Sequence, residues 1–175
     1  MVKCIGVSII KIDVSDLLKK KSAQKAMDFT VELEGFDFGD EYIKITDPVK
    51  FKGDLDSIGE LLELKGQITG TIELTCSRCL VKFPQQLDIE VFEKISNDTE
   101  TVDKDGEVVF IDSDTLDITE IVLNNIILSL PIKRLCKEDC RGLCQQCGTD
   151  LNSSSCNCES SDVDPRLAKL KGFFD

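Results

Sequence analysis

The chain has 175 residues, of which 41% are hydrophobic, and its formal net charge is −12 at pH 7. A chain of this length and composition can bury a core of its own, so it does not depend on disulfides to fold. The negative charge opposes non-specific binding to phosphate backbones, and no apolar run approaches the roughly 18–20 residues that a membrane-spanning helix needs.

The first two thirds of the chain have the pattern of a β protein. Residues 2–12 alternate loosely between apolar and polar side chains, and Asp13 or Ser15 could cap a short helix after them. Apolar residues fall on alternate positions in 68–74 and 87–95, as half-buried strands require, so we expect an antiparallel sheet or a partly open barrel. The segments with β character are 27–33, 42–45, 49–55, 61–75 and 81–95.

The hydrophobic period changes after an acidic loop and one more strand, at residues 108–111. Asp117 and Glu120 then stand at the spacing of a capping box, with Asp in place of the usual Ser or Thr. The apolar stretch behind them predicts a helix over about 117–130 that ends before Pro131. We expect this helix to pack on the sheet, which makes the fold class α+β.

The chain is expected to divide into two parts. Residues 1–131 would form an α+β core domain, and residues 132–175 a cysteine-rich segment that resembles a zinc ribbon and packs on the core. Asp164 before Pro165 predicts that this segment closes with a short helix. Charge follows the division, because the first 130 residues hold 14 Lys and Arg against 26 Asp and Glu, whereas the rest of the chain holds seven of each.

Eight of the nine cysteines form four closely spaced pairs, and the chain has no histidine. The amino terminus does not have the pattern of a secretory signal, so we expect a cytoplasmic protein with reduced cysteines. Four thiolates complete a tetrahedral zinc site, and the pattern therefore predicts one or two zinc ions. Cys4 stands alone and is expected to be a small apolar residue of the first strand. The candidate metal ligands are Cys76 with Cys79, Cys136 with Cys140, Cys144 with Cys147, and Cys156 with Cys158.

Four pairs can be divided between two sites in three ways, and the sequence does not decide among them. The shortest loop to close joins Cys144 and Cys147 to Cys156 and Cys158, which favours that grouping. The remaining pairs would then tie the end of a β-hairpin to the segment after the helix. Gly148 is expected to take the positive φ that turns backbone amides toward sulfur.

Basic residues flank the two pairs that would share this second grouping. They could bind RNA or a protein partner, or they could be solvated charges that balance the thiolates. The candidate binding residues are Arg78, Lys82, Lys133, Arg134, Lys137 and Arg141.

Catalysis has little support in the sequence. Without histidine there is no imidazole base for a nucleophile, and no glycine-rich phosphate-binding loop is present, so we expect no enzymatic activity and no small-molecule substrate. A thiol oxidoreductase stays open as an alternative because C-x2-C can be a redox pair. Such a pair usually sits on a βα unit, whereas residues 76–79 link two strands.

Four motifs resemble the YceD family, the large ribosomal RNA subunit accumulation proteins. They are CSRCL at 76–80, IILSLPIKRLC at 126–136, DCRGLCQQCGTDLN at 139–152 and DPRLAKLK at 164–171. The resemblance implies a bacterial, cytosolic, non-enzymatic factor needed for the accumulation or processing of large-subunit ribosomal RNA. It also implies a working relationship with proteins of that subunit, and paired cysteines consistent with zinc.

Two classes of function therefore stay open. In the first, a zinc-stabilised ribosome-biogenesis factor binds precursor large-subunit RNA through its basic residues, or holds a basic large-subunit ribosomal protein on its acidic surface. In the second, a redox-regulated protein releases zinc when its thiols are oxidised.

Overall fold

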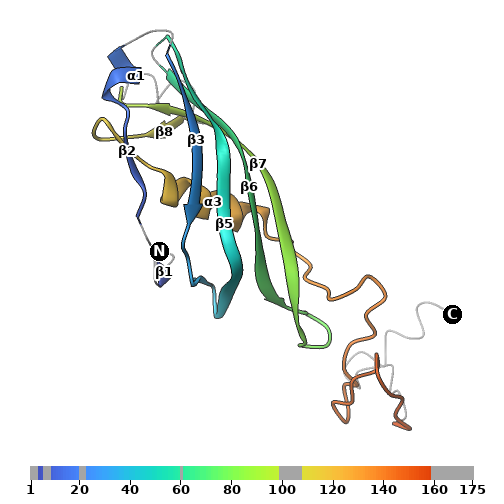
Figure 1. Cartoon of the computed structure of the whole chain (residues 1–175). Coiled ribbons are helices and arrows are strands. Elements are labelled where there is room, and N and C mark those ends of the chain that lie inside the picture. Colours follow the sequence, from blue (N-terminus) through green and yellow to red (C-terminus); the bar gives the residue numbers. More distant parts are fainter. Residues whose placement is uncertain (1–3, 6–8, 20–22, 60, 99–107, 159–175) are drawn as a thin grey trace, which may run out of the picture.

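The computed structural model describes residues 4–5, 9–19, 23–59, 61–98 and 108–158 (Figure 1). Its main feature is a sheet whose strands lie in the order β1 (Cys4–Ile5), β4 (Gly35–Phe38), β5 (Glu41–Ile58), β6 (Leu61–Thr75), β7 (Lys82–Ser96) and β8 (Val108–Phe110). A seventh strand, β3 (Gln24–Val31), also pairs with β5. Neighbouring strands are antiparallel except β7 and β8. The described helices are α1 (Ser15–Lys19) and α3 (Ile118–Ser129), and a small second sheet pairs β2 (Lys11–Asp13) with β9 (Thr115–Asp117).

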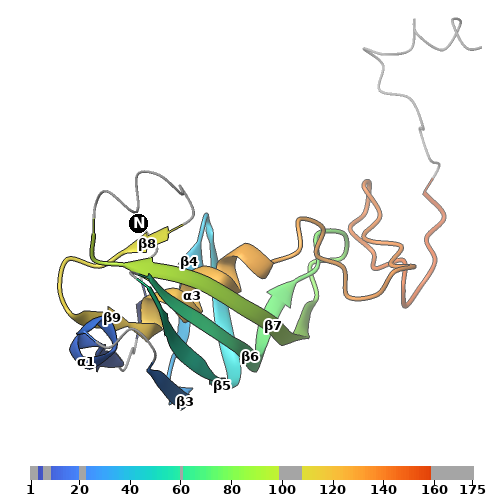
Figure 2. The same cartoon turned by 90° about the horizontal axis from the view of Figure 1, so that it is seen from above.

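The sheet curls into a half-barrel whose inner face is covered by α3 (Figures 1 and 2). Side chains of successive strand residues point to opposite faces, so one face of β6 is turned to the core and the five large apolar side chains on this face are buried. These buried residues are Leu62, Leu64, Ile68, Ile72 and Leu74. Helix α3 contributes Ile118, Ile121, Val122, Leu123 and Ile126 to the same core. None of the helices described is long and apolar enough to cross a membrane.

Two glycines lie opposite each other where β5 and β6 pair, and they permit a close approach of the strands. A Cβ atom on Gly53 would lie 2.1 Å from the carbonyl oxygen of Lys65, and one on Gly66 would lie 2.6 Å from the Phe51 ring. Larger residues would therefore push the strands apart at this point, and the absence of side chains lets the sheet curl around its core.

Several sequence predictions are confirmed by these elements. The strand expected at 61–75 is β6, the one expected at 81–95 is β7, and the strand at 108–111 is β8. The helix expected over about 117–130 is α3, and the Asp117 side chain caps it by accepting a hydrogen bond from the Glu120 backbone N–H at 3.2 Å.

The structure differs from the sequence prediction along β5. We expected separate strands at 42–45 and 49–55, but β5 runs through both, with register shifts between Ile45 and Lys50. Pro48, which has no N–H to donate, lies between these two segments. On one edge of β5, however, pairing passes from β4 to β3 at this point, so the proline removes no ladder hydrogen bond there. Strand β4 was not predicted at all.

Two further predictions are not settled by this fold. The helix expected to start at Asp164 and Pro165 lies outside the described residues. The division into a core of residues 1–131 and a segment of residues 132–175 stays a prediction.

Candidate metal centres

The turn between β6 and β7 meets the chain that follows α3, and the two bring four cysteines together. The backbone N–H of Ser77 donates to the carbonyl of Arg134 at 2.8 Å, and that of Leu143 donates to the carbonyl of Arg78 at 3.1 Å. These bonds lay the segment after α3 along the hairpin turn (Figure 2). The resulting first cysteine group consists of Cys76, Cys79, Cys136 and Cys140.

The first cysteine group has the dimensions of a tetrahedral thiolate site. A zinc–sulfur bond of about 2.3 Å places neighbouring sulfurs of a tetrahedron about 3.8 Å apart. The Sγ atoms of Cys76 and Cys140 are 3.8 Å apart, and those of Cys79 and Cys136 are 3.6 Å apart. All four thiols are free, and these distances are far longer than the roughly 2.05 Å of a disulfide. The group can therefore hold one metal ion.

Apolar side chains enclose the first cysteine group. Cys76, Cys79 and Cys140 are buried, and the residues packed against them are Phe83, Leu135 and Leu143. Burial opposes ionisation of Cys76, but the backbone N–H groups of Cys79, Cys136 and Arg78 lower its pKa to about 6. Burial and then the neighbouring thiols raise the pKa of Cys136 to about 12. Four thiolates therefore need the positive charge of a bound cation to coexist here.

The second cysteine group follows directly in the chain and is built almost entirely from one loop. The backbone N–H of Cys144 donates to the carbonyl of Thr149 at 2.8 Å, and the N–H of Gly148 donates back to the carbonyl of Cys144 at 2.9 Å. Leu143 and Asp150 form a β-bridge across the base of this turn. The group consists of Cys144, Cys147, Cys156 and Cys158, whose sulfur atoms all lie within 4.8 Å of one another.

In the second cysteine group, as in the first, the pKa of one thiol is lowered and that of another is raised. The Thr149 hydroxyl lies 3.0 Å from the Cys147 sulfur, and this hydroxyl and the Thr149 backbone N–H lower the pKa of Cys147 to about 6. The neighbouring Cys147 thiol and burial raise the pKa of Cys158 to about 12. A cation is therefore needed to bring all four sulfurs to the thiolate form.

The residue after each C-x2-C pair takes a left-handed conformation. Gly148 has φ +72°, as the sequence predicts, and Leu80 occupies the equivalent place after Cys79 with φ +60°. The shared geometry supports a common metal-binding turn in both groups. Leucine rarely adopts this conformation, and no sequence pattern predicts it at Leu80.

A side chain that the sequence reasoning missed connects the two cysteine groups. The Asn152 amide nitrogen, on the loop of the second group, donates to the Cys140 sulfur of the first group at 3.5 Å. Its amide oxygen accepts from the backbone N–H of Arg141 at 2.9 Å, and its nitrogen also donates to the Asp150 carboxylate at 2.8 Å. Hydrogen bonds of this kind orient metal ligands and tune their charge. Asn152 lies inside the motif DCRGLCQQCGTDLN, but it matches no pattern that reveals its role from sequence.

The structure divides the six predicted binding residues into two kinds. Arg134 is engaged within the protein, because it forms an ion pair with Glu41, lies over the Phe38 ring and is only 14% exposed in its side chain. Arg78 donates to the carbonyl of Cys140 at 2.7 Å.

The other four cations are exposed, and Arg78 is exposed as well despite its hydrogen bond to Cys140. Lys82 pairs with Glu73 at 2.9 Å and Lys137 lies 3.9 Å from Asp139, although both lysine side chains are about half exposed or more. Lys133 and Arg141 are exposed.

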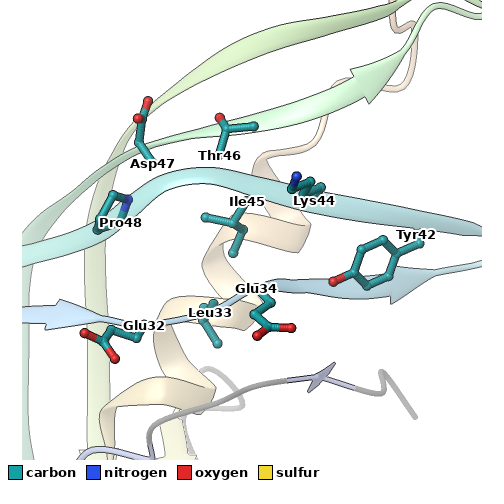
Figure 3. Close-up of a pocket in the computed structure, with 9 residues that line it drawn as sticks. All are labelled: Glu32, Leu33, Glu34, Tyr42, Lys44, Ile45, Thr46, Asp47 and Pro48. Carbon is teal, nitrogen blue, oxygen red and sulfur yellow. The ribbon is translucent and has the colours of Figure 1, made fainter.

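A surface groove of about 560 Å³ lies elsewhere, between the end of β3 and the irregular part of β5 (Figure 3). Three of its six polar side chains are carboxylates, and none of its residues belongs to a cysteine group. The groove therefore adds no thiolate chemistry. It is lined by Glu32, Leu33, Glu34, Tyr42, Lys44, Ile45, Thr46, Asp47 and Pro48.

Comparison with known proteins gives consistent matches. A family model described as large ribosomal RNA subunit accumulation protein YceD matches residues 64–174. The uncharacterized protein YlbN of Bacillus subtilis (strain 168) is 34% identical over 146 residues, which is 82% of this chain and 84% of the relative. An uncharacterized protein of Mycobacterium tuberculosis (strain ATCC 25618 / H37Rv) is 29% identical over 119 residues, covering 66% of this chain but only 57% of the relative.

A third relative has a name that refers to a process. The chloroplastic "Large ribosomal RNA subunit accumulation protein YCED homolog 1" of Zea mays is 38% identical over 60 residues, which is 34% of this chain and 20% of the relative. No solved structure matches the chain.

Proposed function

This chain belongs to the YceD family, and we propose that it is a cytoplasmic, non-enzymatic factor for the accumulation or processing of large-subunit ribosomal RNA. The observation that carries the proposal is the family match over residues 64–174, a range that contains both cysteine groups. The part of the chain that resembles the family is therefore also the part that organises the candidate metal centres.

We infer that zinc occupies each cysteine group. Four thiolates in tetrahedral arrangement are the ligand set that structural zinc sites use, and the sulfur separations in the first group fit that geometry. Zinc would act there as a cross-link that offsets part of the negative charge of the thiolates. The bound ion would fix the turn between β6 and β7 to the segment after α3.

We propose that RNA contacts the protein beside the first cysteine group. Lys133 and Arg141 are exposed, and Lys82 and Lys137 have exposed ammonium-bearing side chains with weak surface ion pairs. Such surface pairs contribute little, so these cations remain able to exchange a carboxylate for a phosphate. Arg134 is left out of this surface because its side chain is engaged by Glu41 and Phe38.

The negative charge of the first 130 residues limits how far bound RNA can extend over the protein. The first 130 residues carry the whole net negative charge of the chain, so RNA that extended over the sheet would be repelled. The RNA contact would be confined to the cysteine-rich end, and the acidic surface would be free to hold a basic large-subunit ribosomal protein.

The proposal is tested by salt-dependent binding of precursor large-subunit RNA. The charge reversal of Lys133 and Arg141 to Glu should weaken binding at least tenfold and flatten the salt dependence by about one unit per lost phosphate contact. The control is the same reversal at Lys50 and Lys52, two exposed lysines on the outer face of β5.

Equal losses in both double variants would show that the contact is not beside the first cysteine group. If the wild-type chain binds no RNA at low salt but retains basic ribosomal proteins in a pull-down, the protein partner is the direct one.

A further inference from the structure

The two cysteine groups contain the same ligands but differ in their access to solvent. Cys76, Cys79 and Cys140 are at most 5% exposed and pack against apolar side chains. In the second cysteine group, Cys147 and Cys158 are both exposed, and none of its four cysteines belongs to an apolar cluster among the described residues. A dissolved reagent can therefore reach the sulfur atoms of the second group more readily than those of the first, in which only Cys136 is partly exposed.

We propose that the second cysteine group is a site of oxidative modification, at which a peroxide converts metal-bound thiolates to disulfides and releases the metal ion while the first group keeps its own. The inference rests on the metal occupancy proposed above, but it does not depend on RNA binding.

The reaction balances with hydrogen peroxide as the oxidant. A thiolate of Cys147 attacks one peroxide oxygen, the O–O bond breaks, and hydroxide leaves, so the sulfur carries the transferred OH as a sulfenic acid. The Cys158 thiolate then attacks this sulfur, the S–S bond forms, and the sulfenic oxygen leaves as a second hydroxide. Two thiolates have lost two electrons, and the peroxide has become two waters after taking up two protons. The metal ion dissociates because the two sulfurs joined in the disulfide no longer bind it as thiolates.

The loop of the second group can form such a bond without disturbing the sheet. Its sulfur atoms already lie within 4.8 Å of one another, and the group is closed by residues 144–158 alone. The first group, in contrast, joins the β6–β7 turn to the segment after α3, and its thiols lie beneath Phe83, Leu135 and Leu143. Oxidation of its three buried cysteines would require the surrounding core to open first.

Loss of the metal ion from the second group should weaken metal binding in the first group, because Asn152 connects the two groups. Its amide donates to the Cys140 sulfur at 3.5 Å and is held in place by Asp150 and by the backbone of Arg141. When oxidation rearranges the loop, Cys140 loses this donor. Removal of such an outer hydrogen bond typically weakens metal binding about 10- to 100-fold. The first ion should then pass more readily to a chelator, although it is not itself oxidised away.

The test uses the full chain purified with zinc, titrated with small portions of hydrogen peroxide. Native mass spectrometry counts the zinc ions, and alkylation followed by peptide mapping identifies which cysteines are oxidised. We expect a one-zinc intermediate in which disulfides are confined to residues 144–158. Simultaneous loss of both ions, or oxidation of the first group at an equal rate, would overturn the proposal.

Asn152→Ala tests the connection between the groups, and Ser155→Ala, an exposed residue of the same loop, is its matched control. We expect Asn152→Ala to speed chelator extraction of the first ion about tenfold. We expect Ser155→Ala to leave this rate unchanged. Equal extraction rates in the two variants would show that Asn152 does not connect the two groups.

The starting material separates the two proposals. A chain that carries no zinc before peroxide is added contradicts the metal occupancy itself, and this inference falls with it. A chain that starts with two zinc ions and loses them together contradicts only the inference made here.

Discussion

Gly142 joins the two cysteine groups in a conformation that only glycine adopts without strain. Its φ is +77°, and an added Cβ would lie 3.0 Å from the carbonyl oxygen of Arg78, inside the metal-binding turn. The left-handed conformation costs other residues about 1–2 kcal/mol, and displacing the carbonyl adds to this, so we expect Gly142→Ala to cost about 2–3 kcal/mol.

The cost should appear as weaker metal binding in the first cysteine group, because the Arg78 carbonyl accepts a bond from Leu143 that holds the group together. Since tenfold in affinity corresponds to about 1.4 kcal/mol, we expect a loss of roughly 30- to 150-fold. Competition with a chromophoric chelator of known zinc affinity measures it directly.

Gly39→Ala is the matched control for the Gly142 variant. Gly39 has φ +64° in the turn between β4 and β5, but nothing lies within 4 Å of its added Cβ. This variant should lower the stability of the sheet and leave zinc affinity unchanged. The reasoning is refuted if Gly142→Ala binds zinc as wild type does, or if Gly39→Ala weakens zinc binding equally.

Three further predictions concern the helix, the thiols and the metal. Asn125→Ala removes the 2.9 Å hydrogen bond from α3 to Glu93 on the sheet and should lower the free energy of unfolding by about 1 kcal/mol in a urea titration; an unchanged midpoint would contradict it. In the metal-free chain, the pKa of Cys147 is about 6, lowered chiefly by the Thr149 hydroxyl, and that of Cys158 is about 12. Between those pH values Cys147 is a thiolate and Cys158 is not, so iodoacetamide should modify Cys147 before Cys158. The rate at Cys147 should fall as the pH drops below about 6, and equal labelling of the two cysteines would contradict this assignment. Chelation should remove hydrogen-exchange protection from residues 131–158 before β5, β6 and β7 lose theirs, whereas uniform loss would mean that the metal supports the whole sheet.

The sequence predicts those parts of the fold that local patterns determine. Alternation of apolar residues is enough to find β6 and β7, because one face of each strand is buried. The Asp117 cap and the apolar run behind it are enough to find α3. The grouping of the cysteine pairs also agrees with the loop-closure argument, because the second group closes over the shortest loop.

Features that depend on tertiary contacts could not be read in this way. The two strands expected at 42–45 and 49–55 are one strand, because Pro48 lies where β5 changes partners, and no local signal reports that change. Arg134 stays a candidate binding residue, but its ion pair with Glu41 from a distant hairpin has no signal in the local sequence. Asn152 and the left-handed Leu80 have roles that appear only once the two cysteine groups are placed side by side.

We propose above that two metal ions bound by eight thiolates organise the cysteine-rich segment, and that the ion of the first cysteine group holds this segment to the β6–β7 turn. The decisive experiment is native mass spectrometry of the chain purified under reducing conditions. We expect a mass increase that corresponds to two zinc ions, with Cys140→Ser reducing it to one. A chain that carries no metal and has eight alkylatable or disulfide-linked cysteines in these groups would contradict it.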